Sequence, residues 1–447
     1  MRYLWLMAPL LACAQTEDGL VLDGGLPRDG GIADGGAQDA GAGDLGLLTG
    51  PLLERPVDEQ VTCSVAAPLR NLRPLSWGYG GATAVVRGQE VLLVREESEP
   101  PNPFEFAPAY LTTGVLGPDG QLTSQRVYPE TTELLTNAAT VVIQDRLYLA
   151  WGQTDGLYFS RETENGYTQP RRLGLNYLAG YYAALVEGHG ALALVWEEQS
   201  FDSGNARYRW ARLDLAGEVV GTPRLLGDYP IRTPPVLLPT ATGWVALLPE
   251  GNDLVIKFFD TDGAETSVQT VARGGDNQVG TGVGFDRGQL ALVALDSGYL
   301  AAWVESNQGG VDAGTAFSGI RLGRLDQDGI LQEAPIWVRA PEFDIDEVEP
   351  RLHRVGNKVA LTWGRGSHIY ICAGCVPDHQ VNLVWLDPVR LAPLSQVARI
   401  FPPDGIRGGG ILRRAEGIAG EHLVFGAGLT FHVHAEPATG AFRCVQN

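Results

Sequence analysis

From about residue 57 onward, one pattern of apolar and polar positions repeats along the chain. Short apolar runs, several of which end in Trp, recur at intervals of about 45–65 residues. The runs are Glu90–Val94, Leu147–Trp151, Leu192–Trp196, Trp244–Leu248, Tyr299–Trp303, Val359–Trp363 and His422–Gly426. Continuous apolar runs of this length are typical of strands that are covered on both faces. The pattern therefore predicts seven copies of one buried strand.

The residues around each buried run complete a unit of four strands. Another apolar run precedes it, as at Ala82–Val86, and a run ending near an Asp follows it, as at Leu254–Asp260. Next come a turn such as Asp262-Gly263 and a last short strand, for example Val268–Ala272 or, in the final unit, Phe442–Val445. Four antiparallel strands in each of seven repeats predict an all-β fold, a single seven-bladed β-propeller. The alternative is a pair of irregular β-sandwiches, which the shared order of elements disfavours.

Composition agrees with this fold and excludes several functions. The 447 residues include 58 Gly and 28 Pro, which favour turns over long helices. The net charge of −20 repels phosphate backbones, so a nucleic-acid partner is not expected. No apolar run has the roughly 18–20 residues that a membrane span needs. We expect one monomeric propeller domain over residues 57–447.

The amino terminus resembles a lipoprotein signal. Residues 1–12 contain Arg2 and a short apolar segment, and Leu10-Leu11-Ala12-Cys13 is similar to a lipobox. The resemblance implies cleavage before Cys13 and lipidation of its thiol, with the lipid membrane as a partner. A short secretory signal with an incidental Cys is the alternative. The expected location is outside the cytoplasm, as an anchored lipoprotein of the outer membrane or cell surface.

Residues 13–56 read as a flexible tether, because Asp, Gly and Ala dominate them and no apolar pattern could build a core. Short acidic units such as Asp29-Gly30-Gly31 recur there. A calcium-binding β-helix would need apolar residues at fixed positions, and these are missing.

Four further cysteines form two candidate disulfides. Cys63 precedes the first repeat and Cys444 lies in the last strand, so closing the ring would bring them together. Cys372 and Cys375 flank a short turn and predict a local disulfide. Zinc is the alternative there, since His368, Cys372, Cys375 and His379 offer four ligands at close spacing. No metal or other cofactor is the preferred expectation.

Two weaker metal signals are interpreted as structural. His432 and His434 share one face of a strand, with His422 on its neighbour, but such pairs are mostly surface residues. The run from Asp260 to Gly263 opens like an EF-hand loop, yet Val271 stands where the loop needs a Glu.

A candidate ligand site follows from propeller geometry. The loops after the buried strands and the connections between blades emerge on one face, around the central channel. Carboxylates and aromatic rings there suit a sugar or a cationic group. The candidate residues are Trp77, Tyr79, Glu97, Asp155, Tyr181, Glu197, Glu250 and Glu305, with Arg365 standing in the corresponding place of the sixth unit.

One segment resembles a known family. Residues 156–173 are similar to a degenerate Asp-box of the sialidase-like propellers, with Gly166 and Thr168 matching and Glu164 in place of Asp. An Asp-box is a structural hairpin, so the resemblance implies fold and not catalysis. No common catalytic motif is present. We therefore expect a binding or scaffolding module at the cell envelope, with a glycan or a protein as ligand. The alternative is a glycoside hydrolase of the sialidase-like kind.

Overall fold

The computed structural model describes most of the chain from Pro51 onward. The described residues are 51–54, 56, 59–71, 82–98, 109–127, 138–153, 155–175, 183–199, 206–229, 234–251, 253–273, 278–279, 290–307, 317–339, 345–367, 380–400, 412–431 and 434–447. They contain no helix, and therefore none that could cross a membrane.

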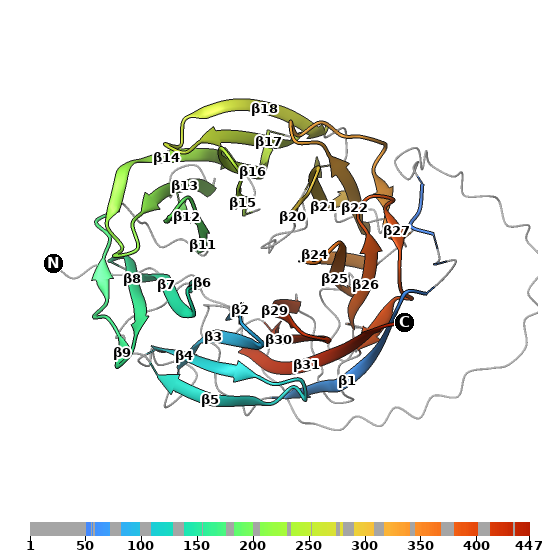
Figure 1. The fold of residues 1–447 in the computed structure, drawn as a ribbon, viewed down its shortest axis with the longest axis horizontal. Coiled ribbons are helices and arrows are strands. Elements are labelled where there is room, and N and C mark those ends of the chain that lie inside the picture. Colours follow the sequence, from blue (N-terminus) through green and yellow to red (C-terminus); the bar gives the residue numbers. More distant parts are fainter. Residues whose placement is uncertain are drawn as a thin grey trace, which may run out of the picture. The chain divides into compact units, whose positions relative to one another are not determined.

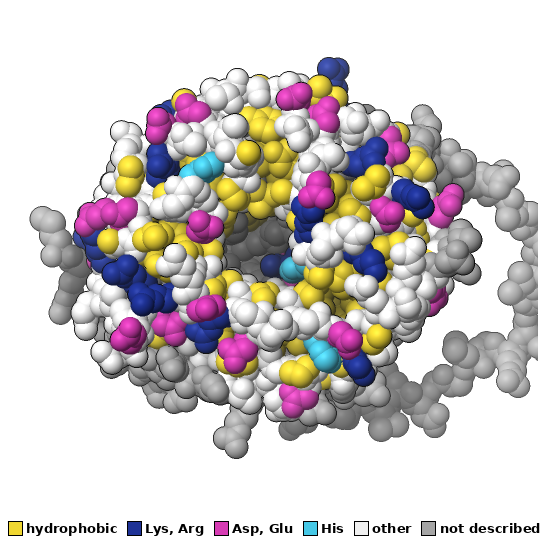
Figure 2. Space-filling model, in the orientation of Figure 1, with side chains coloured by type: hydrophobic (Ala, Val, Ile, Leu, Met, Phe, Trp, Pro, Cys, Tyr) yellow, Lys and Arg dark blue, Asp and Glu magenta, His cyan; other side chains and the backbone are white. Residues whose placement is uncertain are grey.

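Seven antiparallel sheets form a ring, which confirms the predicted fold and number of blades (Figure 1). Figure 2 shows the hollow at its centre, which we call the central channel. We number the blades 1 to 7 along the chain and their strands from the channel outward. The first strands are β2 (Ala82–Arg87), β6 (Ala139–Ile143), β11 (Ala183–Gly188), β15 (Val236–Pro239), β20 (Leu290–Leu295), β24 (Ile345–Val355) and β29 (Leu412–Ala419). The second strands are β3 (Glu90–Ser98), β7 (Arg146–Gln153), β12 (Ala191–Gln199), β16 (Gly243–Glu250), β21 (Gly298–Asn307), β25 (Lys358–Ser367) and β30 (His422–Phe431). All seven predicted buried runs lie in these second strands.

The third and fourth strands complete each blade. The third strands are β4 (Ala109–Leu116), β8 (Gly156–Thr163), β13 (Ala206–Leu213), β17 (Asp253–Asp260), β22 (Phe317–Leu325), β26 (Gln380–Asp387) and β31 (His434–Gln446). The fourth strands are β5 (Leu122–Val127), β10 (Arg171–Arg172), β14 (Val219–Tyr229), β18 (Glu265–Ala272), β23 (Ile336–Trp337), β27 (Ala392–Pro393) and β1 (Val61–Asn71). Short additional strands are β9 (Gly166–Tyr167), β19 (Gln278–Val279) and β28 (Ala398–Ile400), which pair with β8, β21 and β26.

Ring closure corrects one sequence prediction. Phe442–Val445 is not a fourth strand, because it belongs to β31, the third strand of blade 7. The fourth strand is β1, from the other end of the described chain, and Cys63 pairs directly with Cys444. A disulfide joins these two residues, whose Cα atoms are 4.1 Å apart. Blade 7 therefore contains both ends of the propeller chain.

The residues before β1 run along the outer edges of blades 5 and 6. The N–H of Trp337 in β23 donates to Pro51 O at 2.8 Å, and Leu53 N–H donates to Trp337 O at 2.7 Å. Farther along, the N–H groups of Gln60 and Val61 both donate to Leu394 O in blade 6. We call residues 51–54, Gln60 and Val61 the strap. Its first residues belong to the predicted tether, yet they extend the sheet of blade 5.

The core lies between blades, because alternate residues of each second strand pack against opposite neighbours. In β25, Ala360 packs with Phe425 of blade 7, whereas Leu361 packs with Leu300 of blade 5. All four side chains are fully buried. Burial on both faces is why the second strands read as continuous apolar runs.

A recurring Asp turn joins the third strand to the fourth in blades 3, 4 and 5. In blade 3, Asp214 Oδ1 accepts hydrogen bonds from the N–H groups of Ala216 and Glu218, at 2.9 and 2.8 Å. Asp260 and Asp326 make the same pair of bonds in their blades. In these three blades the Asp at the end of the third strand therefore fixes the turn that follows it.

These turns dock on the preceding blade. Gly217 has φ +84°, and a Cβ atom placed on it would lie 2.2 Å from Phe159 Cδ1 of blade 2. Third-strand side chains also donate to the next blade's turn: Arg161 to Leu215 O at 3.2 Å, and Arg212 to Asp262 at 3.1 Å. Each such turn is thus part of the seam between two blades.

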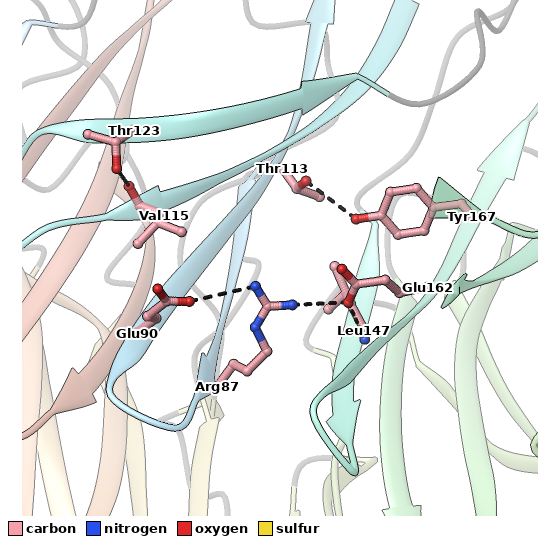
Figure 3. Close-up of polar contacts among 8 residues, drawn as sticks. All are labelled: Arg87, Glu90, Thr113, Val115, Thr123, Leu147, Glu162 and Tyr167. Atoms are coloured by element: carbon pink, nitrogen blue, oxygen red, sulfur yellow. Dashed lines mark hydrogen bonds and ion pairs between the residues drawn. The ribbon is translucent and has the colours of Figure 1, made fainter. Parts of the chain in front are cut away.

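Blades 1 and 2 are joined by an ion pair (Figure 3). Glu162 Oε2 lies 3.0 Å from Arg87 and accepts a hydrogen bond of 3.0 Å from the N–H of Leu147. Arg87 also lies 3.6 Å from Glu90, whose side chain is half exposed. Glu162 therefore connects β8 both to its own blade and to blade 1.

We expect Glu162→Ala to lower the free energy of unfolding by about 1–2 kcal/mol, because a partly buried ion pair and a backbone hydrogen bond are both lost. Glu90→Ala, which removes only the exposed partner of the same Arg87, is the matched control and should cost less than about 0.5 kcal/mol. Urea unfolding of both variants measures the difference. Equal costs would contradict a role for Glu162 in the seam.

Candidate functional site

The two ends of the ring differ in the connections they carry. In an antiparallel meander the turns alternate between ends, so the second-to-third strand loops share one end with the connections between blades. We call this the mouth end. Many of its connections lie outside the described residues, including those with Trp77, Tyr79, Tyr181 and Tyr182. For Glu97 only the backbone, at the mouth end of β3, is described.

One carboxylate at the mouth end of each of blades 3, 4 and 5 is paired with a cation. Arg209 Nε lies 2.5 Å from Glu198 in blade 3, and Arg321 Nε lies 3.2 Å from Glu305 in blade 5. In both blades the Arg stands opposite a Trp, and the Glu lies two residues beyond that Trp. Lys257 Nζ lies 2.8 Å from Glu250 in blade 4. Of the predicted ligand residues, Glu250 and Glu305 are therefore held in ion pairs.

Glu197 occupies a different environment from the other predicted ligand residues. Its side chain is 1% exposed and lies opposite Tyr208, which is fully buried. Val195 and Tyr208, on the same faces of these strands, pack in the core between blades 3 and 4. Glu197 is thus a buried seam residue, whereas Glu198 and Glu250 lie nearer the surface.

Blade 2 presents an aromatic pair beside a carboxylate at the mouth end. The Tyr158 hydroxyl donates to Asp155 Oδ2 at 2.8 Å, and its ring stacks on Trp151 with centroids 6.1 Å apart. Asp155 is exposed. Asp155 is therefore an exposed site residue that the structure places beside an aromatic ring.

Blade 6 holds more buried polar side chains than any other blade in the described part of the chain. They are Glu347, Glu349, Thr362, Gln380, Asn382 and Ser395. Two guanidinium groups face Glu347 at the mouth end, with Arg365 Nη1 at 3.6 Å and Arg339 Nε at 4.0 Å. Ser318 of blade 5 accepts a hydrogen bond of 3.0 Å from Glu347 N–H. This cluster lies in the seam between blades 5 and 6.

A second polar cluster joins blades 6 and 7. Glu416, in the first strand of blade 7, is fully buried, and its Oε1 lies 2.7 Å from His353 Nε2 of β24. The Thr362 hydroxyl donates to the same oxygen. Glu416 lies three residues before the closing pair of the first hairpin of blade 7. At this position blades 1 to 6 carry Ala84, Thr140, Leu185, Val236, Leu292 and Leu352. Burying a carboxylate where the repeat is mostly apolar marks this seam as specialised.

Some of the predicted disulfide and metal residues are described in the structure and others are not. The Cys63–Cys444 disulfide is present, whereas Cys13, Cys372 and Cys375 lie outside the described residues, as do His368 and His379 of the alternative zinc site. His432 is also outside them. Within the described ranges, no group of three or more His, Cys, Asp or Glu side chains could hold a metal ion.

The segment that resembles an Asp-box forms a hairpin between the third and fourth strands of blade 2. Thr163 pairs with Gly166 across its turn. Ser160 Oγ donates to Thr168 O at 2.8 Å, and Thr168 Oγ1 accepts from Arg161 N–H at 3.1 Å. The matching residues therefore hold the hairpin together, and their contacts are structural.

No protein-family model matches the chain, and no curated protein matches it. Solved structures do. A neuraminidase-like protein from A/bat/Guatemala/164/2009 is 9% identical, with 88% of this chain and 97% of that chain covered and a TM-score of 0.40. A thermostable family-43 glycoside hydrolase is 9% identical, with 70% and 89% covered and a TM-score of 0.32. An acylaminoacyl peptidase of Pyrococcus horikoshii is 11% identical, with 81% and 52% covered and a TM-score of 0.42. At such values the likenesses carry no argument about function.

Proposed function

We propose that this protein is an exported, lipid-anchored propeller that binds a carbohydrate at its mouth end. The choice of a carbohydrate as ligand rests on the paired charges in blades 3 to 6. A cationic side chain lies beside each of four carboxylates there, those of Glu198, Glu250, Glu305 and Glu347. Side chains held in ion pairs keep a fixed geometry and offer both donors and acceptors.

Pairing favours a neutral polyhydroxylated ligand over a cationic one. A cation would have to compete with Arg209, Lys257 or Arg321 for the same carboxylates, whereas sugar hydroxyls can bond to both members of a pair. The half-buried ring of Tyr158, which stacks on the buried Trp151 and bonds to Asp155, adds an aromatic edge against which a sugar ring can pack. These features support recognition of a sugar.

A glycan array probed with the purified protein tests the ligand class. We expect binding to a restricted set of glycans. Binding to none of them would contradict the proposal. Incubation with aryl glycosides is the second arm, and turnover there would show a glycoside hydrolase instead of a binding module.

Once a glycan is identified, Glu250→Gln should weaken its binding by about tenfold, which corresponds to about 1.4 kcal/mol. Glu250 is half exposed at the mouth end of β16 and lies 2.8 Å from Lys257. Glu265→Gln is the matched control, because Glu265 lies 3.6 Å from the same Lys257 but belongs to the outer strand β18. Isothermal titration compares the two variants. Equal affinities in both would place the ligand elsewhere.

The anchor is tested independently of the ligand. Cys13→Ser should move the protein from the detergent phase to the aqueous phase in Triton X-114 partitioning, since the thiol that accepts the lipid is lost. The thermal unfolding midpoint should stay unchanged. Partitioning of the unmodified protein to the aqueous phase would contradict lipidation.

A further inference from the structure

Each blade ends in an outer strand, and the free edge of such a strand is a template for pairing with another chain. The outer strands of blades 2, 5 and 6 are two residues long, and β23 of blade 5 is already bridged to the strap. β14 contains Gly221, whose φ is +79°, and Pro223, and β1 contains Pro68. Among the described outer strands, β5 and β18 alone are uninterrupted, and β18 is the longer, with eight residues against six.

β18 has the composition of a strand that pairs along both edges. Its sequence, ETSVQTVA, contains four β-branched residues and one charged residue. Lys and Pro, which commonly protect a free edge, are absent from it. It is the last strand in the order of its sheet and lies on the outer rim of the ring (Figure 1). Val268, in its middle, is 44% exposed.

The middle of β18 is regular. Ser267 to Thr270 pair one to one with Val255 to Phe258 of β17, and register shifts occur only toward the two ends of the strand. In an antiparallel sheet, alternate residues direct their N–H and C=O groups away from the strand on one side. The middle of β18 therefore presents a row of backbone donors and acceptors outward.

Opposite charges stand at the two ends of β18. Glu265 is its first residue, and the exposed Arg273 follows its last residue. Glu265 lies 3.6 Å from Lys257, but the same ammonium lies 2.8 Å from Glu250, so two carboxylates share one cation. Two copies of β18 paired antiparallel about Gln269 set each Glu265 opposite the Arg273 of the other copy. This charge complementarity favours a second copy of the chain over an unrelated strand.

We propose that β18 is the interface of a symmetric homodimer, in which the four-stranded sheets of two copies of blade 4 join into one sheet of eight strands. The paired strands run antiparallel, with the twofold axis at Gln269. Val268 then lies opposite Thr270 of the second copy, and a pair of Glu265 with Arg273 closes each end. The dimer replaces the monomer expected from the sequence, and it depends on neither the proposed carbohydrate ligand nor the anchor.

Sedimentation velocity of the full-length chain tests the dimer, with Cys13→Ser present so that a lipid cannot itself cause association. We expect a monomer–dimer equilibrium with a dissociation constant in the micromolar range, because one strand pair buries less than the roughly 1,200–2,000 Å² of a standard interface. A chain that stays monomeric at millimolar concentration overturns the proposal. That outcome includes the case in which a strand of a different protein occupies the edge.

Charge reversal locates the interface. Arg273→Glu sets like charges opposite each other twice in the symmetric dimer and should weaken dimerisation at least tenfold. Adding Glu265→Arg restores opposite charges and should restore the affinity. Arg443→Glu, at an exposed position of blade 7, is the matched control and should leave the affinity unchanged. The unfolding midpoint of each variant checks that it folds. A dimer that survives Arg273→Glu lies elsewhere and refutes the assignment to β18.

A cross-link at the twofold axis tests the register. Gln269→Cys sets two thiols directly opposite each other, where Cβ atoms are about 4.5–5.5 Å apart, so mild oxidation should link the copies. In Thr266→Cys the two thiols lie six positions apart along the strand, about 20 Å, which a disulfide cannot span. Non-reducing electrophoresis compares both variants with the unmodified chain. Linkage through Thr266→Cys alone, or through neither variant, would contradict the proposed pairing.

Discussion

Replacing both Cys63 and Cys444 with Ala lowers the free energy of unfolding by about 5 kcal/mol, the largest effect that we expect of any change in this chain. The disulfide closes a loop of 381 residues in sequence separation, and the chain-entropy model gives the greatest stabilisation for long loops. It also holds β1, the outermost strand, against β31 in the last blade.

Thermal unfolding with and without dithiothreitol measures this effect. The unmodified protein should lose stability on reduction, and the double variant should not respond to the reductant. A single Cys63→Ala variant under oxidising conditions is a further comparison and should match the double variant. If the oxidised protein and the double variant unfold at the same temperature, the closure of the ring does not depend on the disulfide.

The second large effect is expected at Gly217. An Ala there would place its Cβ 2.2 Å from Phe159 Cδ1 at a backbone φ of +84°, so both steric overlap and backbone strain oppose it. We expect Gly217→Ala to cost about 2–4 kcal/mol, the sum of a left-handed conformation and an overpacked seam.

Gly190→Ala separates the two contributions. Gly190 has φ +67°, and a Cβ placed on it meets no atom within 4 Å, so only the backbone term of about 1 kcal/mol should remain. Urea unfolding compares the variants. A cost at Gly217 no larger than at Gly190 would show that the turn does not transmit packing from blade to blade.

The seven blades could be predicted from the sequence because each second strand is buried on both faces and leaves a continuous apolar run. The closure of the ring could not. The fourth strand of blade 7 is β1, and nothing local to Phe442–Val445 indicates that a partner arrives from the other end of the chain. A search for repeats gives every unit four consecutive strands, so it misses that the fourth strand of blade 7 comes from the residues before blade 1.

The mouth carboxylates show a similar limit. Glu305 is visible in the sequence as an acidic residue after a buried strand, but its partner Arg321 is 16 positions away and is recognised only once the register of β21 and β22 is known. Glu347 was missed altogether, because it follows a connection between blades instead of a second strand. Asn382 gave no signal at all, since a single Asn in a strand is ordinary until its amide is seen to be buried without a partner.

The strap also determines how the propeller responds to a mechanical load. A pull on the chain before Pro51 acts first on the bonds to Trp337, and then on those that Gln60 and Val61 donate to Leu394. Loaded from one end, these hydrogen bonds break one after another at low force, in the manner of an unzipping strand. The opening stops at Cys63, where the covalent bond to Cys444 passes the tension into blade 7. The strap therefore acts as a short extensible section that lengthens before the tension reaches the disulfide.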